Sequence, residues 1–155
     1  MTGPVDTAPY RRDGHLQGHC LCGAVTIAVD GAHVAAIGAC HCAMCRRWSG
    51  TVLSGFEVSP EAVTVSGRVS SYASSDFAHR AFCGTCGSHL WFRDDAADAP
   101  YEFVPGIFAG AHDFPLISEI YVDRAPAYAR LAGNHATATR ADYEARRPFV
   151  EGDDP

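Results

Sequence analysis

The stretches Cys20-Leu21-Cys22-Gly23 and Cys83-Gly84-Thr85-Cys86-Gly87 decide the fold of this chain. In an extended strand, Cα atoms two residues apart are separated by about 6.6 Å. That is too far for two Zn–S bonds of about 2.3 Å to one ion, so we expect the chain to curl after Cys20, and Gly23 permits the curl. In the second stretch, two intervening residues let both sulfurs face one ion, and glycines let backbone N–H groups turn toward the thiolates.

Together these stretches supply four thiolates, the number that closes a tetrahedral structural zinc site. We therefore predict a structural zinc on Cys20, Cys22, Cys83 and Cys86. Such a site would stabilise the fold and would not be catalytic, because it leaves no ligand position for water or substrate.

A third stretch, Cys40-His41-Cys42-Ala43-Met44-Cys45, has three cysteines and a different meaning. Three protein ligands leave one position open, which is typical of catalytic zinc. The alternative is a closed site that a distant histidine or carboxylate completes, or a different partition of the cysteines. The candidate histidines are His41, His79, His89 and His112. His41 lies between two ligands, so we expect it to point away from the metal.

The cysteine count and composition favour metal over disulfides. Seven cysteines cannot all pair, and a Cys-x-Cys disulfide is strained.

The first residues have no secretory signal, and no stretch is long and apolar enough for a membrane span, so we predict a cytoplasmic protein without membrane contact. The net charge of -6 argues against a nucleic-acid partner. A redox thiol switch is a further alternative, and it predicts that metal-free protein stays folded.

Short apolar runs separated by Gly, Pro and Asp predict an all-β domain of antiparallel strands with short peripheral helices. We expect a flexible arm over 1–14, the zinc domain over 15–133, and a C-terminal helix with an acidic tail over 134–155. Asp30-Gly31 is read as a turn. The expected strands are 25–29, 34–39, 51–58, 63–66, 69–73, 78–82, 89–93, 101–104 and 117–122, and the expected helix is 137–147.

Three segments resemble the glutathione-dependent formaldehyde-activating enzyme family, which includes the centromere-protein-V-like proteins. Gly18 to Val25 is similar to the family's opening motif, Cys40 to Gly50 to its second and Phe82 to Leu90 to its third. The resemblance covers roughly Leu16 to Pro126. It implies an Mss4-like β-tent with two zinc ions, the second on Cys40, Cys42 and Cys45.

The resemblance also implies an activity, that of a carbon-sulfur lyase joining a thiol such as glutathione to a small aldehyde, or cleaving the adduct. The residues after Cys45 are then candidate substrate contacts, with Arg46 and Arg47 able to pair with carboxylates and Trp48 able to wall a pocket. The chain departs from the pattern at Glu119, where many members have histidine, and at Tyr128, where tryptophan is common. The rival function is a non-catalytic zinc β-tent that serves as a binding module.

Overall fold

The computed structural model describes residues 5–147 and is all-β, as predicted. Two α-helices, α1 (Ala43–Ser49) and α2 (Arg140–Glu144), and several 3-10 turns connect the strands. The strands are β1 (Arg11–His19), β2 (Thr26–Val34), β3 (Ile37–Cys40), β4 (Leu53–Val58), β5 (Val63–Ser66), β6 (Val69–Ala73), β7 (Ala78–Cys83), β8 (His89–Asp94), β9 (Tyr101–Phe103), β10 (Leu116–Ile120) and β11 (Ala136–Ala138).

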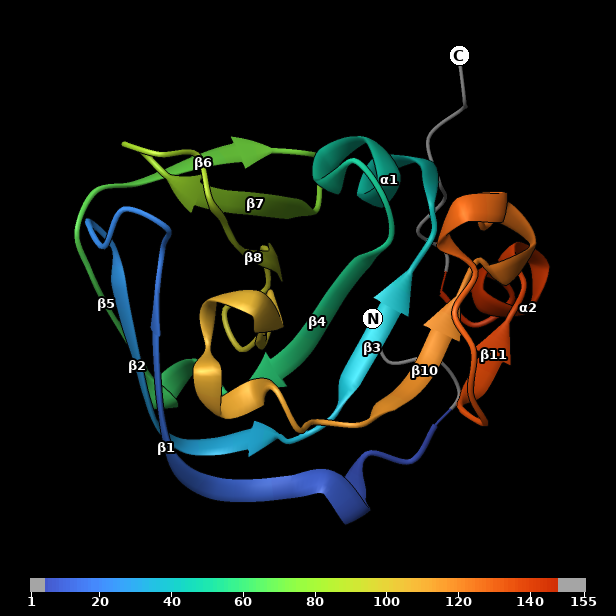
Figure 1. The fold of residues 1–155 in the computed structure, drawn as a ribbon, viewed down its shortest axis with the longest axis horizontal. Coiled ribbons are helices and arrows are strands. Elements are labelled where there is room, and N and C mark those ends of the chain that lie inside the picture. Colours follow the sequence, from blue (N-terminus) through green and yellow to red (C-terminus); the bar gives the residue numbers. More distant parts are fainter. Residues whose placement is uncertain (1–4, 148–155) are drawn as a thin grey trace.

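The strands form one strongly bent sheet, open at its edges (Figure 1). The order along its main path is β11-β10-β3-β4-β9-β8-β7-β6, and β2 adds a second branch by pairing with β1, β4 and β5. The pairing is antiparallel except at β10, which runs parallel to both β3 and β11. The expectation of purely antiparallel sheets is therefore wrong at this edge. The chain leaves after β3 and re-enters beside it, in the same direction, as β10.

Residues 11–14 of the predicted flexible arm form the start of strand β1. β1 pairs with β2 along its whole length, from Arg11↔Val34 to His19↔Thr26. Most β1 side chains are exposed, so the strand lacks the apolar alternation that would identify it in the sequence. Asp30 and Gly31 lie inside β2 and make no turn, which corrects that prediction. Residues 1–4 of the arm lie outside the described residues.

The structure differs from the sequence prediction in two places, at the three-cysteine stretch and at the C-terminal helix. The three-cysteine stretch ends in the unpredicted helix α1, which Gly50 closes in a left-handed conformation. The helix expected over 137–147 is shorter, because β11 takes its first residues into the sheet. A capping box between Thr139 and Asp142 starts α2. The predicted acidic tail lies outside the described residues.

Three phenylalanines form the centre of the main core. Phe56 and Phe103 come from the paired strands β4 and β9, and the ring of Phe108 packs edge-on against both at centroid distances of 5.3 Å. Cys20 and Cys83 belong to the same buried cluster. The four-cysteine site is therefore continuous with the core, and its geometry depends on core packing.

Replacing Phe108 with alanine is expected to lower the free energy of unfolding by about 3–5 kcal/mol, because it leaves a cavity between two rings that cannot close over it. Tyr128, whose side chain is 79% exposed, provides the matched control, and its replacement by alanine should change the free energy by less than about 0.5 kcal/mol. Urea unfolding of both variants measures the difference. Equal effects would contradict the described core.

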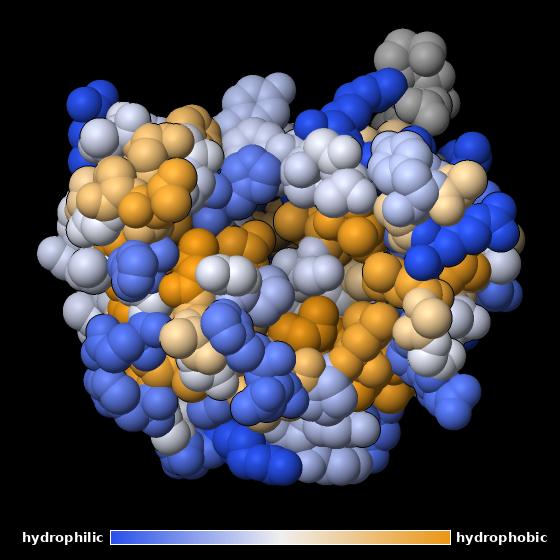
Figure 2. Space-filling view, in the orientation of Figure 1, coloured by the Kyte–Doolittle hydropathy of each residue, from blue (hydrophilic) through white to orange (hydrophobic). Residues whose placement is uncertain are grey.

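The surface is hollowed at the centre of the face seen in Figure 2. Apolar residues gather around this hollow, and polar residues cover much of the rim. Within residues 5–147, no helix is long and apolar enough to cross a membrane.

Candidate metal centres and cavity

The four-cysteine cluster joins two loops that are distant in the sequence. After β1, the chain curls so that the Cys20 and Cys22 sulfurs lie 3.6 Å apart, and Gly23 takes a φ of 75°. The Cys22 sulfur lies 3.9 Å from that of Cys83, at the end of β7. Four sulfurs around one zinc ion would be about 3.8 Å apart. The curl predicted at Gly23 is confirmed, and the spacing fits a tetrahedral ion.

Backbone and hydroxyl donors point at these sulfurs. The N–H groups of Thr85 and Cys86 donate to the Cys83 sulfur at 3.4 and 3.5 Å, as expected of a metal knuckle. The Val25 N–H donates to the Cys20 sulfur at 3.2 Å. The hydroxyl and backbone of Ser88 lower the pKa of Cys86 to about 5. The pKa of Cys20 is also lowered, whereas the hydrogen bond with Cys86 and burial raise that of Cys22 to about 11. Cys20 and Cys86 therefore favour the thiolate, the form that binds metal.

The three-cysteine cluster lies where β3 meets α1. Cys40 is the last residue of β3, Cys42 caps the N-terminus of α1, and Cys45 lies in the first turn of the helix. Their sulfurs lie within 4.8 Å of one another, and all three side chains are buried. The short helix therefore forms around the cluster and turns the third sulfur back toward the other two.

Each of these three sulfurs accepts a hydrogen bond from an N–H group. The Cys42 N–H donates to Cys40 at 3.5 Å, and the Cys45 N–H donates to Cys42 at 3.4 Å. Nη2 of Arg80, from β7, donates to Cys45 at 3.5 Å. Hydrogen bonds from Cys40 and Cys42, with the charge of Arg80, hold the pKa of Cys45 well below its usual range. The neighbouring thiols and burial instead raise the pKa of Cys40 well above its usual range and that of Cys42 to about 12. One negative charge is therefore favoured at Cys45, and the three sulfurs could hold a metal ion.

Among residues 5–147, no histidine or carboxylate joins the three cysteines as a fourth ligand. His41 turns to Glu119 instead, with 2.6 Å between Nε2 and Oε1. His79 pairs with Asp95, and the ring of His89 stacks on Trp48. The open site expected from three-cysteine spacing is consistent with this arrangement.

A cavity of about 90 Å³ opens beside the three-cysteine cluster. Its wall combines the three sulfurs with apolar side chains, two tyrosines and a few charged groups. Besides the three sulfurs, the wall includes Leu53, Phe77, Arg80, Phe92, Asp94, Glu102, Ile120, Tyr121, Tyr143 and Arg147.

The two tyrosines make the cavity wall polar without charging it. Tyr121 is the only described non-glycine residue with positive φ, at 57°, and its hydroxyl donates to Glu144 Oε1 at 3.2 Å. Burial raises the pKa of Tyr121 above its usual value and that of Tyr143 to about 12. Both phenols stay protonated at neutral pH; the Tyr121 proton is donated to Glu144, and the Tyr143 hydroxyl can act as a hydrogen-bond donor.

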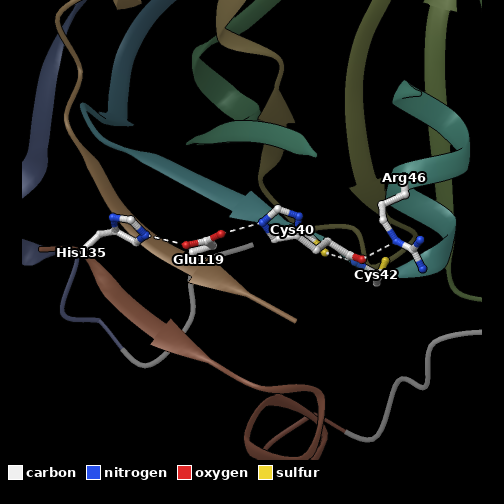
Figure 3. Close-up of polar contacts among 6 residues, drawn as sticks. Cys40, Cys42, Arg46, Glu119 and His135 are labelled. Atoms are coloured by element: carbon white, nitrogen blue, oxygen red, sulfur yellow. Dashed lines mark hydrogen bonds and ion pairs between the residues drawn. The ribbon is translucent and has the colours of Figure 1, made fainter. Parts of the chain in front are cut away.

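A buried carboxylate supports the three-cysteine loop from behind. Glu119 of β10 bridges two histidines, with 2.6 Å from Oε1 to Nε2 of His41 and 2.6 Å from Oε2 to Nε2 of His135 (Figure 3). On the other side of the loop, Nε of Arg46 donates to the carbonyl oxygen of His41 at 2.8 Å. The parallel pairing of Ala39 with Glu119 creates this bridge. It fixes the backbone between Cys40 and Cys42.

Replacing Glu119 with glutamine should lower the free energy of unfolding by about 1–3 kcal/mol. A carboxylate accepts from both histidines at once, whereas an amide presents a donor at one end and leaves one buried histidine N–H facing it. Glu61, an exposed residue, provides the control substitution. Thermal and urea unfolding measure both, and equal stability of the two variants would contradict the bridge.

The predicted substrate contacts after Cys45 do not line this cavity. Arg46 contacts the loop through His41, and Arg47 is absent from the wall. Trp48 lines a smaller, adjacent cavity with Arg80 and His89. Glu119 and Tyr128, the two departures from the family pattern, also lie off the wall. The charged side chain of the cavity wall that donates a hydrogen bond to a sulfur of the cluster is instead Arg80.

One signal in the sequence could have indicated Arg80 and Glu119. Each is a charged residue in a predicted strand at a position whose neighbours two residues away are apolar or aromatic, and the structure buries both, with exposures of 3% and 4%. A buried charge requires a partner. The identity of the partners depends on which strands meet, and this is set by tertiary pairing.

Comparisons with known proteins found a matching family and two similar proteins. The sequence profile of the glutathione-dependent formaldehyde-activating enzyme family matches residues 15–124. An uncharacterized lyase of Schizosaccharomyces pombe is 31% identical over 117 residues, which are 71% of this chain and 80% of the relative. A crystal structure of a Rhodobacter sphaeroides protein, 24% identical, covers 64% of this chain and 98% of its own, with a TM-score of 0.49. This chain therefore belongs to the glutathione-dependent formaldehyde-activating enzyme family.

Proposed function

We propose that this protein is a zinc-dependent carbon-sulfur lyase that joins a glutathione-like thiol to a small aldehyde, or cleaves the adduct. The observation that carries the proposal is the three-cysteine cluster. Its three buried sulfurs have no fourth protein ligand among the described residues, and they form part of a cavity wall. The family's name supports a glutathione-type thiol as one reactant.

The residues proposed to hold zinc divide into two sets. Cys20, Cys22, Cys83 and Cys86 would hold a structural ion, and Cys40, Cys42 and Cys45 a second one. When bound at the second set, zinc supplies an open position at which a thiol loses its proton at neutral pH.

The chain's own residues supply the remaining requirements of the reaction. The sulfur of the thiol forms a bond to the carbonyl carbon, and the proton lost by the thiol ends on the former carbonyl oxygen. Leu53, Phe77 and Ile120 form an apolar wall that limits water around the reacting groups. The cavity is smaller than the roughly 300–1,000 Å³ typical of pockets for drug-sized ligands. We infer that it holds the sulfur end of the thiol and a small aldehyde, with the rest of the thiol outside.

The direct test is the rate at which glutathione and formaldehyde form S-hydroxymethylglutathione with and without the protein. We expect acceleration when the chain holds two zinc ions. No acceleration with both sites occupied would remove this activity and favour a zinc β-tent that serves as a binding module.

A further inference from the structure

Arg80 is a buried cation whose donors are mostly unused. The side chain is 3% exposed, and its guanidinium lies over the ring of Phe92 at 5.0 Å. Nη2 donates to the Cys45 sulfur, but Nε and Nη1 are buried without a hydrogen-bond partner. Leaving buried donors of a charged group unpaired is costly. Their location on the cavity wall points to a ligand as the missing acceptor.

We propose that Arg80 is a further catalytic residue, which binds the carbonyl oxygen of the aldehyde and stabilises its negative charge as the carbon–sulfur bond forms. This inference rests on the proposed function. Because one guanidinium nitrogen already lies 3.5 Å from the Cys45 sulfur, a thiol held beside this cluster would bring its aldehyde carbon and oxygen close to the unpaired nitrogens.

Charge balance favours a neutral aldehyde over a carboxylate-bearing one. Three thiolates and a divalent ion carry one net negative charge, which Arg80 neutralises. A substrate thiolate then adds one negative charge, and a carboxylate would add another on a wall where Asp94 and Glu102 face only one further cation, Arg147. A neutral aldehyde adds none, because the charge only moves from sulfur to oxygen. The small cavity also favours a small aldehyde.

The chemical step balances with these components alone. The thiolate sulfur forms the bond to carbon while the π pair of the C=O bond moves to oxygen. Arg80 donates hydrogen bonds to that oxygen, which then takes up the proton that the thiol lost. In the reverse direction, the same contacts stabilise the oxygen as the carbon–sulfur bond breaks.

The kinetic test compares wild-type protein with Arg80→Gln and Arg80→Lys, all with two zinc ions. The turnover rate for S-hydroxymethylglutathione formation should fall about 10²–10³-fold in Arg80→Gln, as when one oxyanion donor is removed. The lysine variant keeps the charge but has one donor nitrogen in place of three, so it cannot contact Cys45 and the carbonyl oxygen through separate nitrogens and its rate should be intermediate. Arg93→Gln provides the matched control: Arg93 also stacks on an aromatic ring, at 4.5 Å, but donates to Ala97 and Ala99 carbonyls. Its rate should stay within about twofold.

A binding test without turnover separates this inference from the proposed function. Thioacetate has oxygen and sulfur on one carbon, as in the adduct, whereas ethanethiol lacks the oxygen. Calorimetric titration of zinc-loaded protein gives the affinity ratio of the two thiols. This ratio should fall about ten- to a hundredfold in Arg80→Gln and stay unchanged in Arg93→Gln.

The outcomes are distinguishable. In the first outcome, both thiols bind, the reaction is accelerated, and Arg80→Gln matches wild type in rate and affinity ratio. The role of Arg80 is then overturned, while the proposed function stands. If neither thiol binds and no acceleration occurs, the proposed function fails and this role fails with it. If both Arg80 variants lose the second zinc, Arg80 is needed to keep the three cysteines in a metal-binding arrangement. That result would also overturn the proposal.

Discussion

Replacing Cys83 with serine is expected to unfold the protein and to abolish binding of the proposed structural zinc. Cys83 is 1% exposed and lies in the main core cluster, beside the loop of Cys20 and Cys22. Structural zinc binding contributes about 10–16 kcal/mol in zinc-finger peptides, whereas the whole stability of a domain is about 5–15 kcal/mol. Loss of one ligand therefore removes enough free energy to abolish the folded state.

Circular dichroism and zinc content measure this effect together. Thr85 lies exposed in the same knuckle, so Thr85→Ala is the matched control and should keep its fold and its zinc. Complete chelation of wild-type protein should reproduce the loss of structure seen in Cys83→Ser. If the dichroism of the chelated protein were unchanged, metal binding by the four cysteines would not be needed for folding. A redox role for the thiols would then be favoured.

Replacing Cys42 with serine should abolish activity while the protein stays folded. Cys42 caps helix α1 by accepting from the Cys45 N–H. Serine is also a good N-cap residue, so the helix keeps its first hydrogen bond. A neutral hydroxyl is a poor substitute for a thiolate as a zinc ligand. The substitution thus separates the metal role of Cys42 from its structural role.

The expected result for Cys42→Ser is one zinc ion per chain, an unchanged dichroism spectrum and a rate close to that of the uncatalysed reaction. Cys42→Ala should lose the same activity and also about 1 kcal/mol of stability, because it lacks the cap. Full activity in Cys42→Ser with one zinc ion would show that the second cluster does not carry the chemistry.

The cysteine grouping and most strands could be predicted from the sequence because they depend on local spacing. β5 and β6 have the predicted bounds, and the curl at Gly23 follows from the reach of two sulfurs. β1 could not be predicted, because a largely exposed strand has no apolar alternation. Helix α1 has only seven residues, too few for a periodic pattern, and a cysteine serves as its cap.

The contacts that Glu119 and Arg80 make around the three-cysteine cluster could not be predicted from local spacing. The Glu119 bridge joins His41 to a residue 78 positions away through parallel pairing of β3 and β10. Arg80 contacts Cys45 across 35 positions and from a different strand. Only tertiary structure identifies these partners. Arg46 and Arg47 are predicted as substrate contacts because they directly follow Cys45. The cavity instead lies on the side of the cluster where β7 contributes Arg80.

The central claim is that the three-cysteine cluster holds zinc with an open position for a thiol. Zinc content combined with X-ray absorption of the loaded protein tests it most directly, before and after addition of glutathione. We predict two ions per chain, one with four sulfur ligands and one with three, and a fourth sulfur at the second ion once glutathione is added. Two ions with four protein ligands each, and no change on adding glutathione, would contradict the account.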